Sequence, residues 1–120
     1  MNQGILVIGH GSRAQEAQQT FKSIIDKLKA RGYKDVEGAH MELAEPNIRK
    51  AISKLAEKGV DTILVVPLFI YSGIHIQEDI PQILKEVNQD YPHITIRMGK
   101  ALEDDDLLIG LLEKRIQEIL

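Results

Sequence analysis

Two histidines and a glutamate follow stretches that have the composition of buried β-strands. His10 comes directly after the first such stretch, residues 4–9, and Glu42 lies at the end of the second, residues 36–43. His75 lies in a long connection after the third. Imidazole and carboxylate suit borderline divalent ions such as Co²⁺, Ni²⁺ and Fe²⁺. A site with only two or three protein ligands leaves positions open for a substrate, so this set predicts metal handling rather than metal storage.

Short apolar runs alternate along the chain with longer stripes of helical periodicity. Strands are expected at 4–9, 36–43, 62–66 and 94–98, and helices from Ala14 to Leu28, from Pro46 to the stop at Gly59, from Ile80 to Val87, and after the acidic run 103–106. Alternating βα units imply a parallel sheet with right-handed crossovers. We therefore expect a single small doubly wound α/β domain over residues 1–120, with a four-stranded, mainly parallel sheet and helices on both faces.

The ends of the strands decide which polar residues can meet. In an open parallel sheet, ligands bind beyond the carboxyl ends of the strands, where helix N-termini also point. This rule places His10, Glu42 and His75 in one cleft. His93 precedes the fourth strand and belongs to the opposite edge, whereas His40 lies inside the second strand and is a candidate for supporting the site.

A glycine-rich turn surrounds His10. Gly9 and Gly11 allow a tight turn whose backbone N–H groups, together with Arg13, suit an anion such as a carboxylate or phosphate. An ordinary strand-to-helix turn with Ser12 as the helix N-cap explains the same residues. Both interpretations remain open, although a nucleotide-binding P-loop is excluded because no Gly-Lys-Ser or Gly-Lys-Thr follows.

The connection after the third strand, residues 68–78, is long and apolar. Loops of this length inside a small domain are usually functional, and this one fits a wall against a flat organic ligand or a partner subunit. Asp79 is expected to cap the helix entered through Pro81, and Glu45 occupies the same kind of position before Pro46. The wide apolar face of the last helix fits either packing on the sheet or a subunit contact.

Composition excludes several classes of protein. The 120 residues include no cysteine, which excludes thiolate zinc sites, iron–sulfur clusters, thiol nucleophiles and disulfides. A formal net charge of −3 argues against a nucleic-acid partner. No stretch approaches the roughly 20 apolar residues that span a bilayer, and the first residues lack the basic region of a signal peptide. We therefore expect a soluble cytoplasmic protein with no membrane partner.

Several blocks together carry a family resemblance. They are His-Gly-Ser-Arg within 9–13, Met-Glu-Leu-Ala-Glu-Pro at 41–46, Pro-Leu-Phe at 67–69, Gly-Ile-His at 73–75 and Asp-Ile-Pro at 79–81. In this order and spacing the chain resembles the short-form CbiX-type sirohydrochlorin cobaltochelatases, which belong to the class II tetrapyrrole chelatases. The resemblance covers essentially the whole chain.

The resemblance implies ATP-independent insertion of a divalent metal ion into sirohydrochlorin, in cobalamin or related tetrapyrrole biosynthesis. Co²⁺ is the first expectation, with Ni²⁺ and Fe²⁺ as alternatives, and the ion is a substrate rather than a permanently bound cofactor. The family's metal-binding histidines correspond to His10 and His75. Short members form homodimers that build the cleft between subunits.

The chemistry of ring metallation suggests a role for each residue. The cation must lose water and two pyrrole protons must leave, and imidazole, with a reference pKa of about 6.5, can assist both steps at neutral pH. We expect His10 and His75 to bind the ion, one of them to accept a proton, and Glu42 to compensate charge or accept the second. The carboxylates of the ring are assigned to Arg13 and the N–H groups of Gly11, Ser12, Ser72 and Gly73, and its apolar surface to Leu68, Phe69 and Ile70.

Two other functions remain open. A non-catalytic carrier of metal or tetrapyrrole would use the same residues, and only turnover separates it from an enzyme. A phosphotransfer enzyme with His10 as the phosphoryl acceptor is disfavoured, because histidine phosphatases place an arginine where Gly9 stands.

Overall fold

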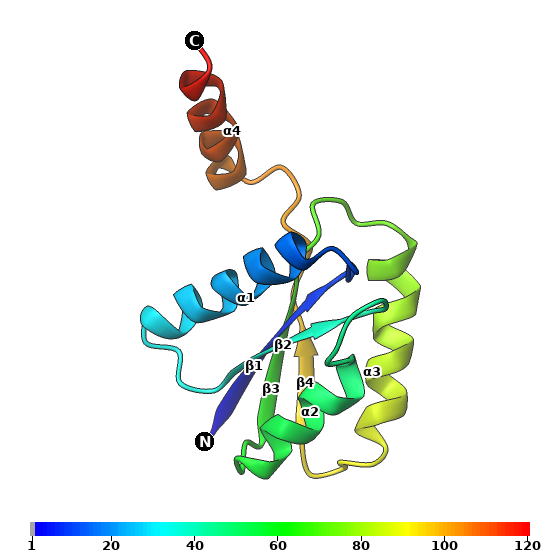
Figure 1. Ribbon diagram of the computed structural model, residues 1–120. Helices are drawn as coiled ribbons and strands as arrows, with labels where there is room; N and C mark the ends of the chain where they lie inside the picture. Colours follow the sequence, from blue (N-terminus) through cyan, green and yellow to red (C-terminus); the bar gives the residue numbers. More distant parts are fainter. Residues whose placement is uncertain (1) are drawn as a thin grey trace.

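The computed structural model describes residues 2–120 and contains one four-stranded sheet of order β2-β1-β3-β4 (Figure 1). The central strands are β1 (Gln3–Gly9) and β3 (Thr62–Pro67), and the edge strands are β2 (Val36–His40) and β4 (Thr95–Met98). Every pair of neighbouring strands is parallel. The predicted doubly wound α/β architecture is confirmed, and the sheet is parallel throughout.

Helices cover both faces of the sheet. Helix α1 (Gln15–Ala30) lies on one face, and α2 (Ile48–Glu57) and α3 (Ile80–Asn88) lie on the other (Figure 1). Successive side chains of a strand point to opposite faces. Leu6 of β1 is therefore fully buried in the core under α2 and α3, whereas Val7 packs in a smaller core with α1.

The last helix, α4 (Asp106–Glu118), extends away from the sheet (Figure 1). Asp105 caps it, because its carboxylate accepts the N–H of Leu107 at 2.9 Å. No residue of α4 is buried, so the interpretation that it packs on its own sheet is wrong, and a subunit contact stays a prediction. Within residues 2–120, no helix is long and apolar enough to cross a membrane.

The second strand is shorter than its sequence suggests. It ends at His40 instead of residue 43, because the chain turns back and the N–H of His40 donates to the carbonyl of Pro46 at 2.9 Å. Helix α2 then begins at Ile48 with Asn47 as its N-cap, whose side chain accepts the N–H of Lys50. The prediction that Pro46 starts this helix is wrong by two residues. Glu42 therefore lies in a loop rather than at a strand end.

Candidate active site

Backbone contacts tie the turn after β1 to the loop after β2. The N–H of Met41 donates to the carbonyl of Gly9 at 3.0 Å, and the N–H of Glu42 donates to that of His10 at 3.1 Å. Gly11 has φ +105°, and a Cβ on it would lie 1.7 Å from the carbonyl oxygen of Glu42. Only glycine permits this approach. As a result the side chains of His10 and Glu42 meet, with Nε2 and Oε1 3.2 Å apart.

His75 reaches the same edge from the connection after β3. It begins a π-helical turn, η1 (His75–Asp79), which continues directly into α3. Turns of this type are rare and are frequently found at functional sites. The carboxylate of Asp79 forms no bond to the start of α3, so its predicted role as a cap is wrong. Its Oδ2 lies instead 2.8 Å from Nδ1 of His75.

The two imidazoles lie next to each other. The ring centres of His10 and His75 are 5.3 Å apart, and Phe69 packs beside both, at 6.4 and 6.3 Å. With metal–nitrogen distances of about 2.0–2.1 Å and a tetrahedral angle, two imidazoles on one ion have ring centres about 5 Å apart. The side chains are 46% and 42% exposed. The spacing thus suits a shared cation that solvent or a ligand can reach.

The donor set of one chain is sparse. Within residues 2–120, no group of three or more His, Asp or Glu side chains has an arrangement that could hold a metal ion. Each imidazole instead has one carboxylate partner, Glu42 for His10 and Asp79 for His75. A pair of imidazoles leaves most coordination positions of a divalent ion to other ligands. Such a site suits an ion that is transferred to another ligand better than an ion that is bound permanently.

The residues expected to bind the tetrapyrrole carboxylates lie around His10 and at the far end of the loop. Gly11 and Ser12 line a hollow of about 210 Å³ together with His10 and Leu68. The predicted N-cap role of Ser12 is wrong, because α1 begins after Ala14; the Ser12 hydroxyl accepts the N–H of Ala14 at 3.0 Å. Arg13, Ser72 and Gly73 are exposed. A carboxylate-binding role for these residues stays a prediction.

The exposed apolar surface of this loop extends beyond the three residues expected to contact the ring, Leu68, Phe69 and Ile70. Leu68 and Phe69 are only partly exposed and pack against the two cores. The open apolar surface is formed by Ile70, Tyr71 and Ile74, which are 45%, 81% and 63% exposed. Tyr71 and Ile74 are absent from the predicted set. Their apolar character in a long loop was the available signal.

A second hollow, of about 360 Å³, lies on the other side of the histidine pair. It is lined by Met41, Glu42, His75, Asp79, Gln82 and Ile83. The loop after β2 and helix α3 thus form its walls. The candidate site is an open rim between two modest hollows rather than a closed pocket.

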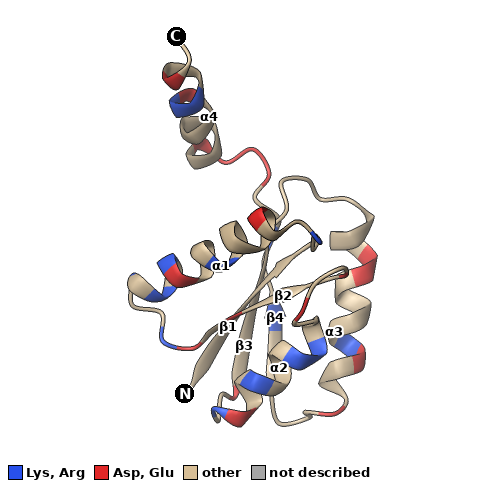
Figure 2. Ribbon diagram, viewed as in Figure 1, with Lys and Arg blue, Asp and Glu red and all other residues tan. Residues whose placement is uncertain are grey.

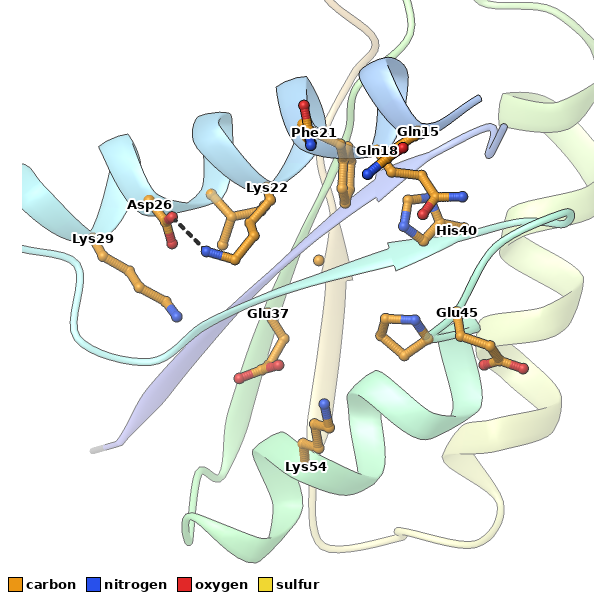
Figure 3. Close-up of a pocket in the computed structure, with 14 residues that line it drawn as sticks. Gln15, Gln18, Phe21, Lys22, Asp26, Lys29, Glu37, His40, Glu45 and Lys54 are labelled. Atoms are coloured by element: carbon orange, nitrogen blue, oxygen red, sulfur yellow. Dashed lines mark hydrogen bonds and ion pairs between the residues drawn. The ribbon is translucent and has the colours of Figure 1, made fainter. Parts of the chain in front are cut away.

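A larger hollow lies at the outer edge of β2, between α1 and α2 (Figure 3). Its volume is about 540 Å³, and none of His10, Glu42 and His75 lines it. His40 lines both this hollow and the smaller one beside His10, and its ring packs 4.6 Å from that of Phe21. Burial lowers the pKa of His40 below its usual value, while the charge of Glu45 opposes the shift. His40 is therefore held mainly neutral behind the site.

Comparison with known proteins shows the family of this chain. The model of the CbiX family matches residues 4–119. This chain belongs to the CbiX family.

His93, by contrast with the histidines of the rim, is exposed just before β4, as expected for a residue outside the site.

Among CbiX-family relatives, several have about the length of this chain. The chain is 37% identical to the sirohydrochlorin cobaltochelatase of Methanosarcina acetivorans, over 98% of this chain and 96% of the relative. It is 36% identical to that of Sulfurisphaera tokodaii, over 98% and 93%. Other relatives are longer: the chain covers 52% of the chloroplastic sirohydrochlorin ferrochelatase of Arabidopsis thaliana, at 34% identity.

Solved structures of two similar proteins have the same fold as this chain. The sirohydrochlorin chelatase SirB of Bacillus subtilis in complex with cobalt matches with a TM-score of 0.95 and 32% identity. The match covers 99% of this chain but 51% of SirB. A CbiX protein of Marinobacter aquaeolei matches with a TM-score of 0.83 and 25% identity, over 97% of this chain and 95% of that one. The CbiX fold thus occurs both as a chain of this length and as about half of a longer one.

Proposed function

We propose that this protein inserts a divalent metal ion into sirohydrochlorin without ATP, in cobalamin or related tetrapyrrole biosynthesis. The observation that carries the proposal is the pair of imidazoles, 5.3 Å apart on an open rim of a CbiX-family chain. The full-length relatives named cobaltochelatases favour Co²⁺ as the substrate ion. Ni²⁺ and Fe²⁺ are the alternatives, since all three ions suit imidazole ligands.

His10 and His75 would bind the ion and replace part of its water shell. As the ion passes to the ring, one of the two imidazoles accepts a pyrrole proton on the nitrogen that the ion leaves, because neutral imidazole is an effective base near pH 7. Glu42, 3.2 Å from His10, stabilises the positive charge that results or takes the second proton. The reaction needs no covalent intermediate, since holding metal and ring in register supplies much of the rate.

The tetrapyrrole would lie across the rim. Its flat surface covers Phe69, Ile70, Tyr71 and Ile74, which removes apolar area from water at roughly 25 cal/mol per Å². Its carboxylates reach Arg13 and the backbone N–H groups of the turn after β1 and of residues 72–73. These local donors are needed because the chain as a whole has a net charge of −3.

We further propose that two copies of this chain form a homodimer through α4. Five apolar side chains of this helix, Leu107, Ile109, Leu111, Leu112 and Ile116, are 44–85% exposed. A helix of 13 residues is marginal in water without packing, and Figure 2 shows mostly uncharged residues along it beyond an acidic connection. The partner that packs on this helix face is a second copy of the chain. SirB matches 99% of this chain and is about twice as long, so two copies of this chain together have about the length of SirB.

Anaerobic turnover tests the proposed activity. The absorbance of sirohydrochlorin is followed with Co²⁺, Ni²⁺ or Fe²⁺ and a catalytic amount of protein. We expect many turnovers, and a loss of at least about 100-fold in His10→Ala and His75→Ala, since removal of a group that acts in the transition state has effects of this size.

His93→Ala is the matched control, since His93 is exposed before β4 and should leave the rate unchanged. A reaction that stops at one equivalent would identify a carrier. Full activity in both rim variants would refute the roles of these histidines.

A further inference from the structure

Asp79 has no role in the chemistry described so far, yet it makes the shortest contact to either histidine of the rim. Its Oδ2 lies 2.8 Å from Nδ1 of His75, and both side chains are about half exposed. An ionised carboxylate can only accept a hydrogen bond, so Nδ1 must carry the hydrogen. In a neutral imidazole the other nitrogen then has the free lone pair. Nε2 of His75 is thereby left as its metal-binding atom.

We propose that Asp79 is a positioning residue that fixes His75 in the tautomer with hydrogen on Nδ1 and presents Nε2 to the metal ion. The inference rests on the proposed function insofar as the ion is the substrate of a chelatase. Carboxylates that bond to a ligating histidine in this way also raise its basicity, and their loss typically weakens metal binding about 10- to 100-fold.

The backbone holds the two residues in this relation. Both belong to the single turn η1, closed by the N–H of Ile80 donating to the carbonyl of His75. Ile76 and Ile80, within and just after the turn, are buried in the main core. Because the core fixes the backbone of this turn, the position of Asp79 relative to His75 is fixed as well. The hydrogen bond between the two side chains then sets the orientation of the imidazole.

The alternative role of Asp79 is to cap the N-terminus of α3, and the structure does not support it. Its carboxylate makes no hydrogen bond at the start of that helix. Glu42 pairs with the other imidazole, since its Oε1 lies 3.2 Å from Nε2 of His10. The two imidazoles are thus oriented through different nitrogens by carboxylates from different parts of the chain.

The first test is the tautomer in the metal-free protein. Long-range ¹H–¹⁵N spectra at about pH 7.5 distinguish the protonated from the unprotonated nitrogen of each imidazole. We expect hydrogen on Nδ1 of His75 in the wild type, loss of this preference in Asp79→Ala, and its partial recovery in Asp79→Asn, whose amide oxygen still accepts the bond. Glu78→Gln is the matched control, because Glu78 lies in the same turn, is exposed, and should change nothing.

The second test is the affinity for Co²⁺ alone, titrated without tetrapyrrole. We expect Asp79→Ala to bind roughly 10-fold more weakly or worse, Asp79→Asn to be intermediate, and Glu78→Gln to equal the wild type. Backbone amide spectra establish that each variant is folded. Hydrogen on Nε2 in the wild type, or a folded Asp79→Ala with unchanged tautomer and affinity, would overturn the inference.

Neither measurement requires turnover, so the two proposals can fail separately. A protein that inserts no metal but shows the expected tautomer and affinity changes would refute the chelatase function alone. An active chelatase with hydrogen on Nε2 of His75 would refute the role of Asp79 alone.

Discussion

Replacing Gly11 by alanine should inactivate the rim while leaving the rest of the fold in place. Gly11 has φ +105°, and its new Cβ would lie 1.7 Å from the carbonyl oxygen of Glu42, where ordinary contacts are 3.4 Å or longer. The turn after β1 and the loop after β2 must therefore separate by more than about 1 Å. A displacement of about 1 Å at a reacting centre can cost roughly 100-fold in rate.

The same substitution also strains the backbone. Alanine in the left-handed region costs about 1–2 kcal/mol of stability. Gly32 provides a matched control, because its φ is +102° and a Cβ there would meet nothing within 4 Å. Gly32→Ala should show the same backbone strain without the displacement of His10 and Glu42.

The assay combines urea unfolding with the anaerobic chelatase reaction. We expect both variants to lose about 1–2 kcal/mol of unfolding free energy, with a further loss in Gly11→Ala from the steric clash. Only Gly11→Ala should lose about 100-fold in kcat. If a folded Gly11→Ala keeps the wild-type rate, the contact between the two loops does not position the site, and the argument from Gly11 is wrong.

Further expectations concern α4, His40 and the start of α2. Leu112→Glu places a charge on the apolar face of α4, where Leu112 is 52% exposed. We expect sedimentation equilibrium to show a dimer for the wild type and a monomer for this variant. A monomeric wild type would contradict the proposed homodimer. Burial lowers the folded-state pKa of His40, so its neutral form contributes stability that is present above about pH 6.5 and is lost as the pH falls. Wild type should thus lose more unfolding free energy between pH 7.5 and 5.5 than His40→Gln, and equal losses would contradict this. Asn47→Ala removes the cap of α2 and should cost about 1 kcal/mol in urea unfolding; no change would show that water replaces the cap.

Much of the fold could be predicted because it depends on local pattern. Buried strands such as β3, and the helical stripes between them, show their periods directly in the sequence. The end of β2 could not be predicted this way. Met41 and Leu43 continue the apolar composition of a strand, but the chain turns back so that the N–H of His40 bonds to Pro46, while Met41 and Glu42 bond to the end of β1 and the turn after it. Such contacts between distant segments leave no period in the sequence.

The proximity of His10, Glu42 and His75 could be predicted from the sequence, but their hydrogen-bond partners could not. That His10, Glu42 and His75 share one edge follows from the topology of a parallel sheet. The contact of Asp79 with His75 was missed, because a helix start with a nearby proline suggests a cap. The spacing of four residues between His75 and Asp79 was the available signal, since residues so spaced lie on one side of a helical turn.

The size of the rim gives an independent reason for a second copy of the chain. The hollows beside the histidines measure about 210 and 360 Å³, which is below and near the lower end of the range of about 300–1,000 Å³ that is common for pockets enclosing a drug-sized ligand. A tetrapyrrole with many carboxylates is larger still, so these hollows would enclose only part of it. An ion held between imidazoles that are 46% and 42% exposed would also stay close to water. A second rim placed over the ring by the proposed contact through α4 would cover the other face and exclude that water, which strengthens the electrostatic contribution of Glu42 and Asp79 where protons leave.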